Sequence, residues 1–247
     1  MILVVDAGNS RLKWGLAAPG ANVLGGDWAH CGALENSRLG ELSLRWAALP
    51  QPATVLCANV AGAASAAAIR TALAPWGVDA AFLRPQERAA GVVNRYDEPA
   101  QLGADRWASA IAAWQRRRSA CIVVNAGTAT TIDFVSAAAE FLGGMILPGA
   151  MLMKRALQRG TAGLGLQEGN IDLQSRNTAD AIASGCLFAQ IGAIECARRG
   201  FAAGAPVLLS GGAAALLSGR IAAPCEELPS LALEGLFILA SAGGLQA

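Results

Sequence analysis

The chain has 247 residues, of which 54% are apolar and 15% charged, and its 19 basic and 18 acidic residues leave a net charge of +1. This length fits one large or two small domains, and the balanced charge argues against a general nucleic-acid-binding surface. No run of about 18 uninterrupted apolar residues occurs, so we expect no membrane-spanning helix. Six scattered cysteines, no C-x-x-C pair and a single histidine argue against structural zinc and are typical of a reducing cytoplasm, and the N-terminus resembles no signal peptide.

The first half of the chain reads as a strand hairpin followed by alternating strands and helices. Short apolar runs and period-2 alternation predict strands, and longer alanine-rich segments predict helices. The predicted elements are a strand at 2–5, a turn at 6–10, strands at 12–17, 54–60 and 80–85, a helix at 62–77, a loop at 92–103 and a helix at 104–118. The basic run at 115–118 then lies at a helix C-terminus, where cations complement the helix dipole.

The second half restarts the same pattern. It predicts strands at 121–125 and 131–135 around a turn, then a strand, a Gly-Pro turn and a helix within 140–157. A long helix at 177–200, a strand–turn–helix at 206–217 and a C-terminal helix follow. The tryptophans and isoleucine on one face of the helix at 104–118 are expected in the core, namely Trp107, Ile111 and Trp114.

The turn after the first strand occurs twice. Four residues of the first hairpin correspond to four of the second at a constant offset of 119: Val4, Val5, Ala7 and Gly8 match Val123, Val124, Ala126 and Gly127. We therefore predict a duplicated α/β fold with domains at 1–118 and 119–247. The crevice between such domains is the default ligand site.

Glycine-containing turns of this kind can bind phosphate. The chain has neither a Walker G-x-x-x-x-G-K-[ST] motif nor a Rossmann G-x-G-x-x-G motif. Successive backbone amides in a turn can form an anion-binding nest, and glycine allows close approach. Asp6 at the strand end could hold Mg²⁺ directly or through water, and Lys13 would add positive charge.

The paired turns and a third glycine turn at 209–214 resemble the acetate and sugar kinase, Hsp70 and actin superfamily of ATP-binding proteins. More narrowly, the chain resembles type III pantothenate kinases over nearly its whole length. The motifs that carry the resemblance are DAGNSRLKW (6–14), GADRW (103–107), GTATTID (127–133), GGMILPG (143–149) and NTADAI (177–182). The resemblance implies a ribonuclease H-like, actin-like fold and the ATP-dependent phosphorylation of pantothenate on the path to coenzyme A.

The resemblance also implies an ATP site. The residues of the first phosphate loop would be Asp6, Ala7, Gly8, Asn9, Ser10, Arg11, Leu12 and Lys13. Asp6 would bind Mg²⁺ with ATP, and Thr128 would belong to the second phosphate loop. Gly211 and Gly212 match the glycine turn near adenosine.

A pantothenate site is implied as well, with residues that have ordinary structural alternatives. Phosphoryl transfer needs an acceptor for the hydroxyl proton, and family resemblance assigns this role to Asp105, which could otherwise cap a helix. Arg106 suits a carboxylate or phosphate, or a surface ion pair. Tyr96 could be a loop anchor and Thr178 a helix cap instead of substrate contacts. The remaining predicted substrate residues are Gly103 and Ala104.

Two positions depart from the family pattern. Asn125 stands where the family usually has an aspartate that binds a monovalent cation, commonly K⁺ or NH₄⁺, and Ala213 replaces a frequent aspartate after the third turn. The resemblance further implies a homodimer. Two rival hypotheses remain: another small-molecule kinase on the same fold, and an ATP-binding regulator without turnover.

Overall fold

Both repeated segments form antiparallel hairpins in the computed structural model of the chain, which describes residues 1–161 and 168–243. The first pairs β1 (Ile2–Ala7) with β2 (Arg11–Ala17), and the second pairs β8 (Cys121–Ala126) with β9 (Ala129–Val135). The bounds of β8 are those of β1 shifted by 119, as the repeat predicts. The following strands slip by one residue, because the second turn is one residue shorter.

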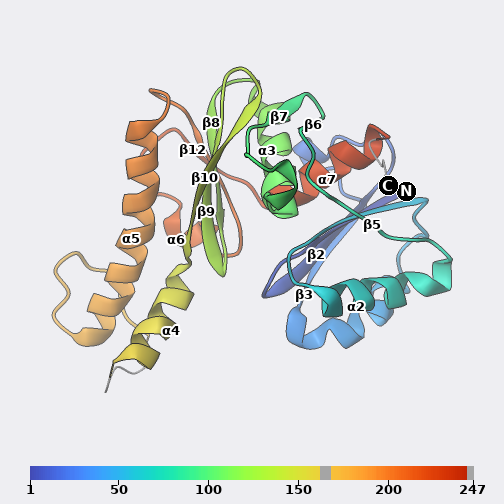
Figure 1. Ribbon diagram of the computed structural model, residues 1–247. Helices are drawn as coiled ribbons and strands as arrows, with labels where there is room; N and C mark the ends of the chain where they lie inside the picture. Colours follow the sequence, from blue (N-terminus) through green and yellow to red (C-terminus); the bar gives the residue numbers. More distant parts are fainter. Residues whose placement is uncertain (162–167, 244–247) are drawn as a thin grey trace. The chain divides into compact units, whose positions relative to one another are not determined.

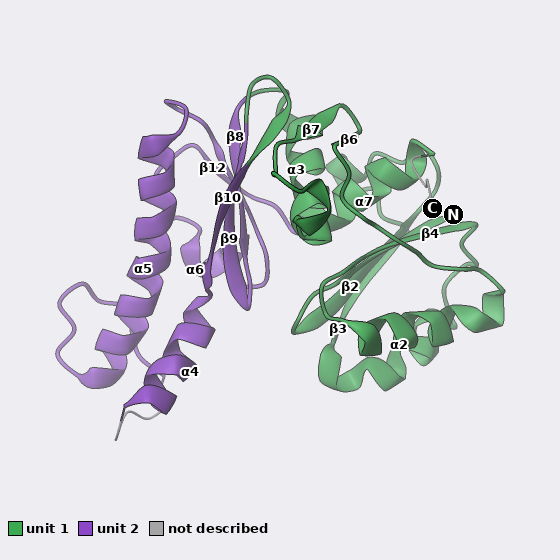
Figure 2. Cartoon of the chain, in the orientation of Figure 1, with its two compact units in different colours: residues 1–119, 136–142, 230–247 green, residues 120–135, 143–229 purple. Residues whose placement is uncertain are grey.

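The hairpins belong to two compact units (Figures 1 and 2). Unit 1 contains residues 1–119 and 136–142 and the chain from Ser230 onward, and unit 2 contains 120–135 and 143–229. The first crossing between units falls beside the predicted boundary at 118. The division into contiguous domains at 1–118 and 119–247 describes the two copies of the duplicated repeat, and it stays a prediction.

Unit 1 is a five-stranded sheet with helices on both faces. Its strand order is β3 (His30–Glu35), β2, β1, β4 (Thr54–Asn59) and β5 (Ala81–Phe82). β1 is antiparallel to β2 and parallel to β4. The helical elements are η1 (Val23–Gly25), η2 (Asn36–Glu41), α1 (Leu42–Trp46), α2 (Ala63–Leu73), η3 (Ala74–Trp76), η4 (Pro99–Gln101), α3 (Ala104–Arg117) and α7 (Leu231–Ser241).

The core of unit 1 explains why β1 is a continuous apolar run. Leu3 and Val5 on one face pack in a cluster with Trp46 and Ile69 from α1 and α2. α7 contacts β1 and β4 and packs against α3. A strand buried on both faces has no polar face to alternate with.

Unit 2 repeats this topology. Its strands follow the order β12 (Cys225–Glu227), β11 (Val207–Ser210), β8, β9 and β10 (Glu140–Pro148), which mirrors β5, β4, β1, β2 and β3. The helices are α4 (Ala150–Gly160), α5 (Thr178–Gly200) and α6 (Ala214–Leu217). The parallel pairing of β8 with β11 matches that of β1 with β4. The predicted duplicated actin-like fold is therefore confirmed.

One predicted loop is partly wrong. Residues 92–94 form β7 (Val92–Asn94), which pairs with β6 (Arg88–Ala89) and with the first residues of β10. The Pro and Gly residues that suggested a loop all lie after Asn94, and they do punctuate the chain up to Gly103. β7 brings Tyr96 beside Phe141, and the centroids of these two rings are 5.7 Å apart.

The basic run at the end of α3 does more than complement the helix dipole. Arg116 Nη2 lies 2.9 Å from Glu234 Oε1 in α7, and Arg116 also donates to the Leu24 carbonyl oxygen at 2.8 Å. Glu234 is buried, and Gly235 beside it lies so close to α3 that a Cβ would stand 1.8 Å from the Ala108 oxygen.

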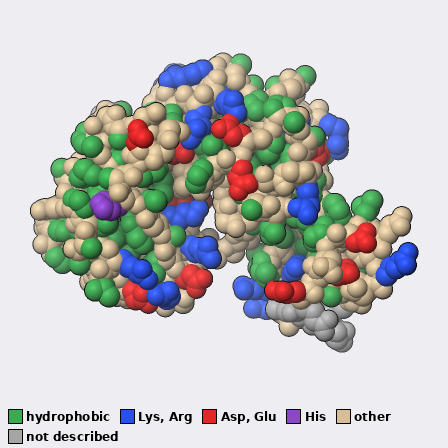
Figure 3. All heavy atoms as spheres, turned by 180° about the vertical axis from the view of Figure 1, so that it is seen from behind, with side chains coloured by type: hydrophobic (Ala, Val, Ile, Leu, Met, Phe, Trp, Pro, Cys, Tyr) green, Lys and Arg blue, Asp and Glu red, His purple; other side chains and the backbone are tan. Residues whose placement is uncertain are grey.

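On the face drawn in Figure 3, basic and acidic side chains are interspersed.

Within residues 1–161 and 168–243, α5 is the helix whose length and composition would allow a membrane crossing, with a mean hydropathy of 1.2. Its Leu187, Ile194 and Ala197 pack in the core cluster of unit 2. A single helix of this length and composition is weak evidence for a membrane span, and the expected absence of a span stays a prediction.

Candidate active site

Asp6 lies near the end of β1, where the sheet register places Lys13 directly opposite it on β2. The carboxyl is partly buried, and burial together with the negative charge of Asp105 raises the pKa of Asp6 from 3.8 to about 7, while Lys13 lowers it. Burial disfavours the charged form and a neighbouring carboxylate disfavours it further. A cation placed here would relieve both effects.

Asp105 lies in the first turn of α3, but it is not the helix cap. Gly103 occupies the N-cap position, and Asp105 Oδ1 accepts a hydrogen bond from the Arg106 N–H at 2.9 Å. A Cβ on Gly103 would stand 2.7 Å from this oxygen, so glycine leaves room for the carboxylate. Burial raises the pKa of Asp105, against the opposing hydrogen bond and the charge of Arg106.

The two aspartates interact electrostatically, so unit 1 holds a pair of carboxyl groups with raised pKa values. Pairs of this kind occur where proton transfer or metal binding takes place, although structural networks also produce them. A carboxylate whose pKa is raised is a better proton acceptor than an ordinary one. Chemically, such a pair can hold a divalent cation with one carboxylate and accept a proton with the other.

Arg106 is buried, so the alternative of a surface ion pair is wrong. Its Nη1 donates to the Tyr96 hydroxyl at 2.7 Å. The guanidinium lies 5.6 Å from the Tyr96 ring centroid and 5.7 Å from that of Phe141. The segment after β7, the start of α3 and β10 thus bring Tyr96, Arg106 and Phe141 together, and Phe141 is the distant one in sequence. This aromatic enclosure could not be found from sequence, since Phe141 belongs to no motif.

The second repeated turn is built from three predicted motifs. Gly149 N donates to the Thr128 oxygen at 2.9 Å, and Ala213 N donates to the Ala126 oxygen at 3.0 Å. A Cβ on Gly149 would lie 2.2 Å from the Gly127 oxygen, and one on Gly211 would lie 2.2 Å from the Ala126 oxygen. The GGMILPG and LSGGAA segments therefore hold the turn at Gly127 and Thr128 from two sides.

Asn125 lies in a row of polar side chains across three strands of unit 2. The register places Thr131 of β9 and Ser210 of β11 beside it. Cross-strand partners lie on the same face of a sheet. Thr131 Oγ1 is buried and has no hydrogen-bond partner among the described residues. Neutral oxygens of this kind suit a weakly held monovalent cation better than a divalent one.

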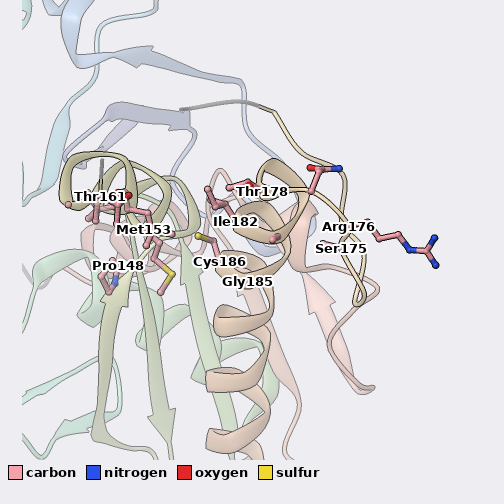
Figure 4. Close-up of a pocket in the computed structure, with 15 residues that line it drawn as sticks. Pro148, Met153, Thr161, Ser175, Arg176, Thr178, Ile182, Gly185 and Cys186 are labelled. Carbon is pink, nitrogen blue, oxygen red and sulfur yellow. Dashed lines mark hydrogen bonds between the residues drawn. The ribbon is translucent and has the colours of Figure 1, made fainter. Parts of the chain in front are cut away.

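Thr178 is the first residue of α5 and lines a pocket of about 1170 Å³ between α4 and α5 (Figure 4). The alternative that Thr178 caps the helix is wrong, because the cap is Asn177, whose side chain accepts from the Asp180 N–H at 2.9 Å. Mostly apolar residues line the pocket, including Pro148, Met153, Ile182 and Cys186. Sequence reasoning did not foresee this pocket.

The predicted site residues fall into separate groups. The group in unit 1 contains Asp6 to Lys13, Tyr96 and Gly103 to Arg106, and the groups in unit 2 are the turn around Thr128 with Gly211 and Gly212, and Thr178 in its pocket. Within the described residues no three His, Cys, Asp or Glu side chains could together hold a metal ion. A single carboxylate with phosphate oxygens is enough for Mg²⁺, so Asp6 fits that role.

A duplicated sheet with glycine turns and a carboxylate at the first strand end defines the class of actin-like ATPases and small-molecule kinases. Solved structures share this fold: a conserved putative Baf family transcriptional activator from Campylobacter jejuni has a TM-score of 0.64 at 21% identity, covering 98% of this chain and 100% of that one. A putative 2-dehydro-3-deoxygalactonokinase from Sinorhizobium meliloti has a TM-score of 0.58 at 12% identity, covering both chains fully.

The particular family is narrower. The family model for type III pantothenate kinase matches residues 2–199. The type III pantothenate kinase of Aromatoleum aromaticum is 48% identical, covering 97% of this chain and 98% of the relative. That of Dechloromonas aromatica is 42% identical, covering 97% and 99%. The chain belongs to the type III pantothenate kinase family.

The raised pKa of Asp6 predicts a pH-dependent stability. The folded protein keeps this proton up to pH about 7, whereas the unfolded chain releases it near 3.8, so stability falls as the pH rises between these values. Asp6→Asn removes the penalty. We expect the variant to be more stable than wild type by up to about 4 kcal/mol at pH 8, without Mg²⁺ or nucleotide, and by much less at pH 4.5. Urea denaturation at both pH values measures this; an equal difference at both would contradict it.

Proposed function

We propose that this protein transfers the γ-phosphoryl group of ATP to the primary hydroxyl of pantothenate, the first step of coenzyme A biosynthesis. Membership of the type III pantothenate kinase family over residues 2–199 supports this reaction. The structural observation that carries the proposal is the interaction of Asp6 with Asp105 in unit 1, beside the buried Arg106.

Each carboxylate has a separate role in the proposed reaction. Asp6 would hold Mg²⁺ with ATP, and this cation would supply positive charge to offset that of the phosphates. Asp105 accepts the proton of the pantothenate hydroxyl as that oxygen attacks. The amides of the turns at Gly8 and Gly127 bind phosphate oxygens, and Lys13 adds positive charge. Gly211 and Gly212 lie near adenosine, a role that family resemblance alone supports.

Arg106 and Tyr96 form the proposed subsite for the pantothenate carboxylate. A guanidinium matches a carboxylate in charge and geometry. Enclosure by Tyr96 and Phe141 supports this role, because removal from water strengthens the attraction. Gly103 and Ala104 set the backbone beside Asp105, and Thr178 offers a hydroxyl to the substrate.

We also propose a cytoplasmic homodimer. Large apolar side chains are exposed on β10 and α4, namely Met145, Ile146, Met151, Leu152 and Leu157. Large apolar side chains exposed on two consecutive elements favour an interaction surface there. Size-exclusion chromatography with light scattering tests the dimer, and a monomer at assay concentration would contradict it.

Asn125 supports a monovalent-cation site of reduced affinity. The carbonyl of its side chain and Thr131 Oγ1, which has no partner in the part of the chain that the structure describes, supply neutral oxygens, but the negative charge usual in the family is absent. K⁺ or NH₄⁺ should activate, and Asn125→Asp should lower the half-activating concentration about tenfold or more, because the restored charge adds Coulombic attraction. Rates in Na⁺, K⁺ and NH₄⁺ buffers measure this. No activation in either protein would remove the site.

A substrate panel tests the proposed function against a different kinase on the same fold. Purified protein with Mg²⁺ and ATP is offered pantothenate, a 2-keto-3-deoxy sugar acid or an amino sugar, and ADP release is followed. Pantothenate should be the acceptor by at least about a hundredfold in kcat/KM, since a site built for a carboxylate and amide discriminates strongly against analogues that leave its polar groups unpaired. If no ADP is released with any of the three acceptors, the result would favour a non-catalytic regulator.

A further inference from the structure

Asn36 contacts the first repeated turn at two points, although it lies 28 residues from Gly8. It is the first residue of η2, directly after β3. Its side-chain Nδ2 donates to the Gly8 oxygen at 2.9 Å, and its backbone N–H donates to the Ser10 oxygen at 3.0 Å. The turn is therefore held from outside the β1–β2 hairpin.

The bond to Gly8 sets the direction of the next amide. A trans peptide is planar, and its C=O and N–H point in opposite directions. Because the Gly8 carbonyl points at Asn36, the Asn9 N–H points away from η2. The N–H of Gly8 itself already donates to the Arg11 oxygen at 3.0 Å. The Asn9 amide is thus the donor in this turn whose direction the Asn36 side chain determines.

We infer that Asn36 is a positioning residue that holds the first turn in its phosphate-binding conformation. The inference rests on the proposed function, in which the turn at 6–13 binds ATP phosphates. Without the side-chain amide, the Gly8–Asn9 peptide can rotate, and only part of the population presents the amide correctly. An apparent dissociation constant rises in inverse proportion to that fraction.

The other end of the same side chain favours this role over a purely structural one. Asn36 Oδ1 is buried and has no hydrogen-bond partner among the described residues. A buried unpaired acceptor costs stability. If Asn36 served only to stabilise the fold, its unpaired oxygen would work against that role. A role in orienting the turn explains why asparagine is present despite this destabilisation.

The test compares nucleotide affinity in four proteins. They are wild type, Asn36→Ala, Asn36→Asp and the control Asn22→Ala, which removes an exposed asparagine that accepts from Gly25 N–H at 3.1 Å in η1 of the same unit. Calorimetry with a non-hydrolysable ATP analogue and Mg²⁺ should show about tenfold weaker binding for Asn36→Ala. Asn36→Asp should be at least as weak, because a carboxylate has no donor. KM for ATP should rise in step, whereas KM for pantothenate should stay within twofold of wild type.

Wild-type nucleotide affinity in folded Asn36→Ala would overturn the inference, and so would a parallel rise in both KM values. If Asn36→Ala does not fold, Asn36→Asp decides by the same criterion. If neither folds, Asn36 is structural and the inference is wrong. Lys13→Ala distinguishes a failure of the proposed function from a failure of the Asn36 inference. If both Lys13→Ala and Asn36→Ala bind the analogue normally, the turn does not bind phosphate. If Lys13→Ala binds weakly and Asn36→Ala binds normally, only the role of Asn36 is refuted.

Discussion

Asp105→Asn should keep its fold and its nucleotide affinity but lose turnover by about 10²–10⁴-fold, the usual cost of removing a general base. The amide has nearly the same shape and still accepts from the Arg106 N–H through its carbonyl oxygen, so the start of α3 should remain intact. It cannot take the hydroxyl proton. The loss should therefore appear in kcat, with KM for both substrates changed only a few-fold.

Initial rates and calorimetry with an ATP analogue measure the two halves of this prediction. Asp79→Asn is the matched control, because Asp79 is an exposed aspartate of the same unit with no contact in the site. Turnover of Asp105→Asn within a few-fold of that control would show that another group accepts the proton.

Gly149→Ala should lower kcat/KM by about a hundredfold, the second-largest effect we expect. The new Cβ would lie 2.2 Å from the Gly127 oxygen and 2.8 Å from the Thr128 oxygen, and both neighbours are backbone. The turn must therefore move. A displacement of about 1 Å in a group that positions the reacting phosphate costs on the order of a hundredfold.

The control for Gly149→Ala is Gly192→Ala, in an open position of α5 with nothing within 4 Å of the added Cβ. There alanine should stabilise the helix by roughly 1 kcal/mol and leave activity unchanged. A Gly149→Ala enzyme with wild-type kcat/KM would show that the second turn does not depend on this contact, or that it is not part of the site.

The repeat in the sequence was enough to predict the duplicated sheets, because hairpin strands are local and their apolar runs are clear. The one-residue slip between β2 and β9 could not be predicted, since it depends on a turn length that the match at Gly8 and Gly127 hides. Helices α3 and α7 pack through Ala108 and Gly235, residues that look ordinary in sequence. Such contacts between distant segments leave no periodic signal.

The candidate site follows the same division. Motifs mark Asp6, Asp105 and Arg106, and the structure places all three in unit 1, while their roles in the reaction stay predictions. Phe141 and Asn36 were missed, because neither lies in a motif and each acts on a residue far away in the chain. The N-cap of α5 is Asn177 and not Thr178. The sequence pattern does not locate a helix end to within one residue.

Hydrogen exchange on the wild-type protein tests most directly whether each of the two repeated turns binds nucleotide phosphates. Peptides covering 6–13 and 125–130 are compared with and without a non-hydrolysable ATP analogue and Mg²⁺. We predict slower exchange in both peptides, at the same half-saturating concentration of the analogue. Protection of only one turn, or of neither at a concentration that saturates binding, would contradict the phosphate-binding role proposed for the two turns.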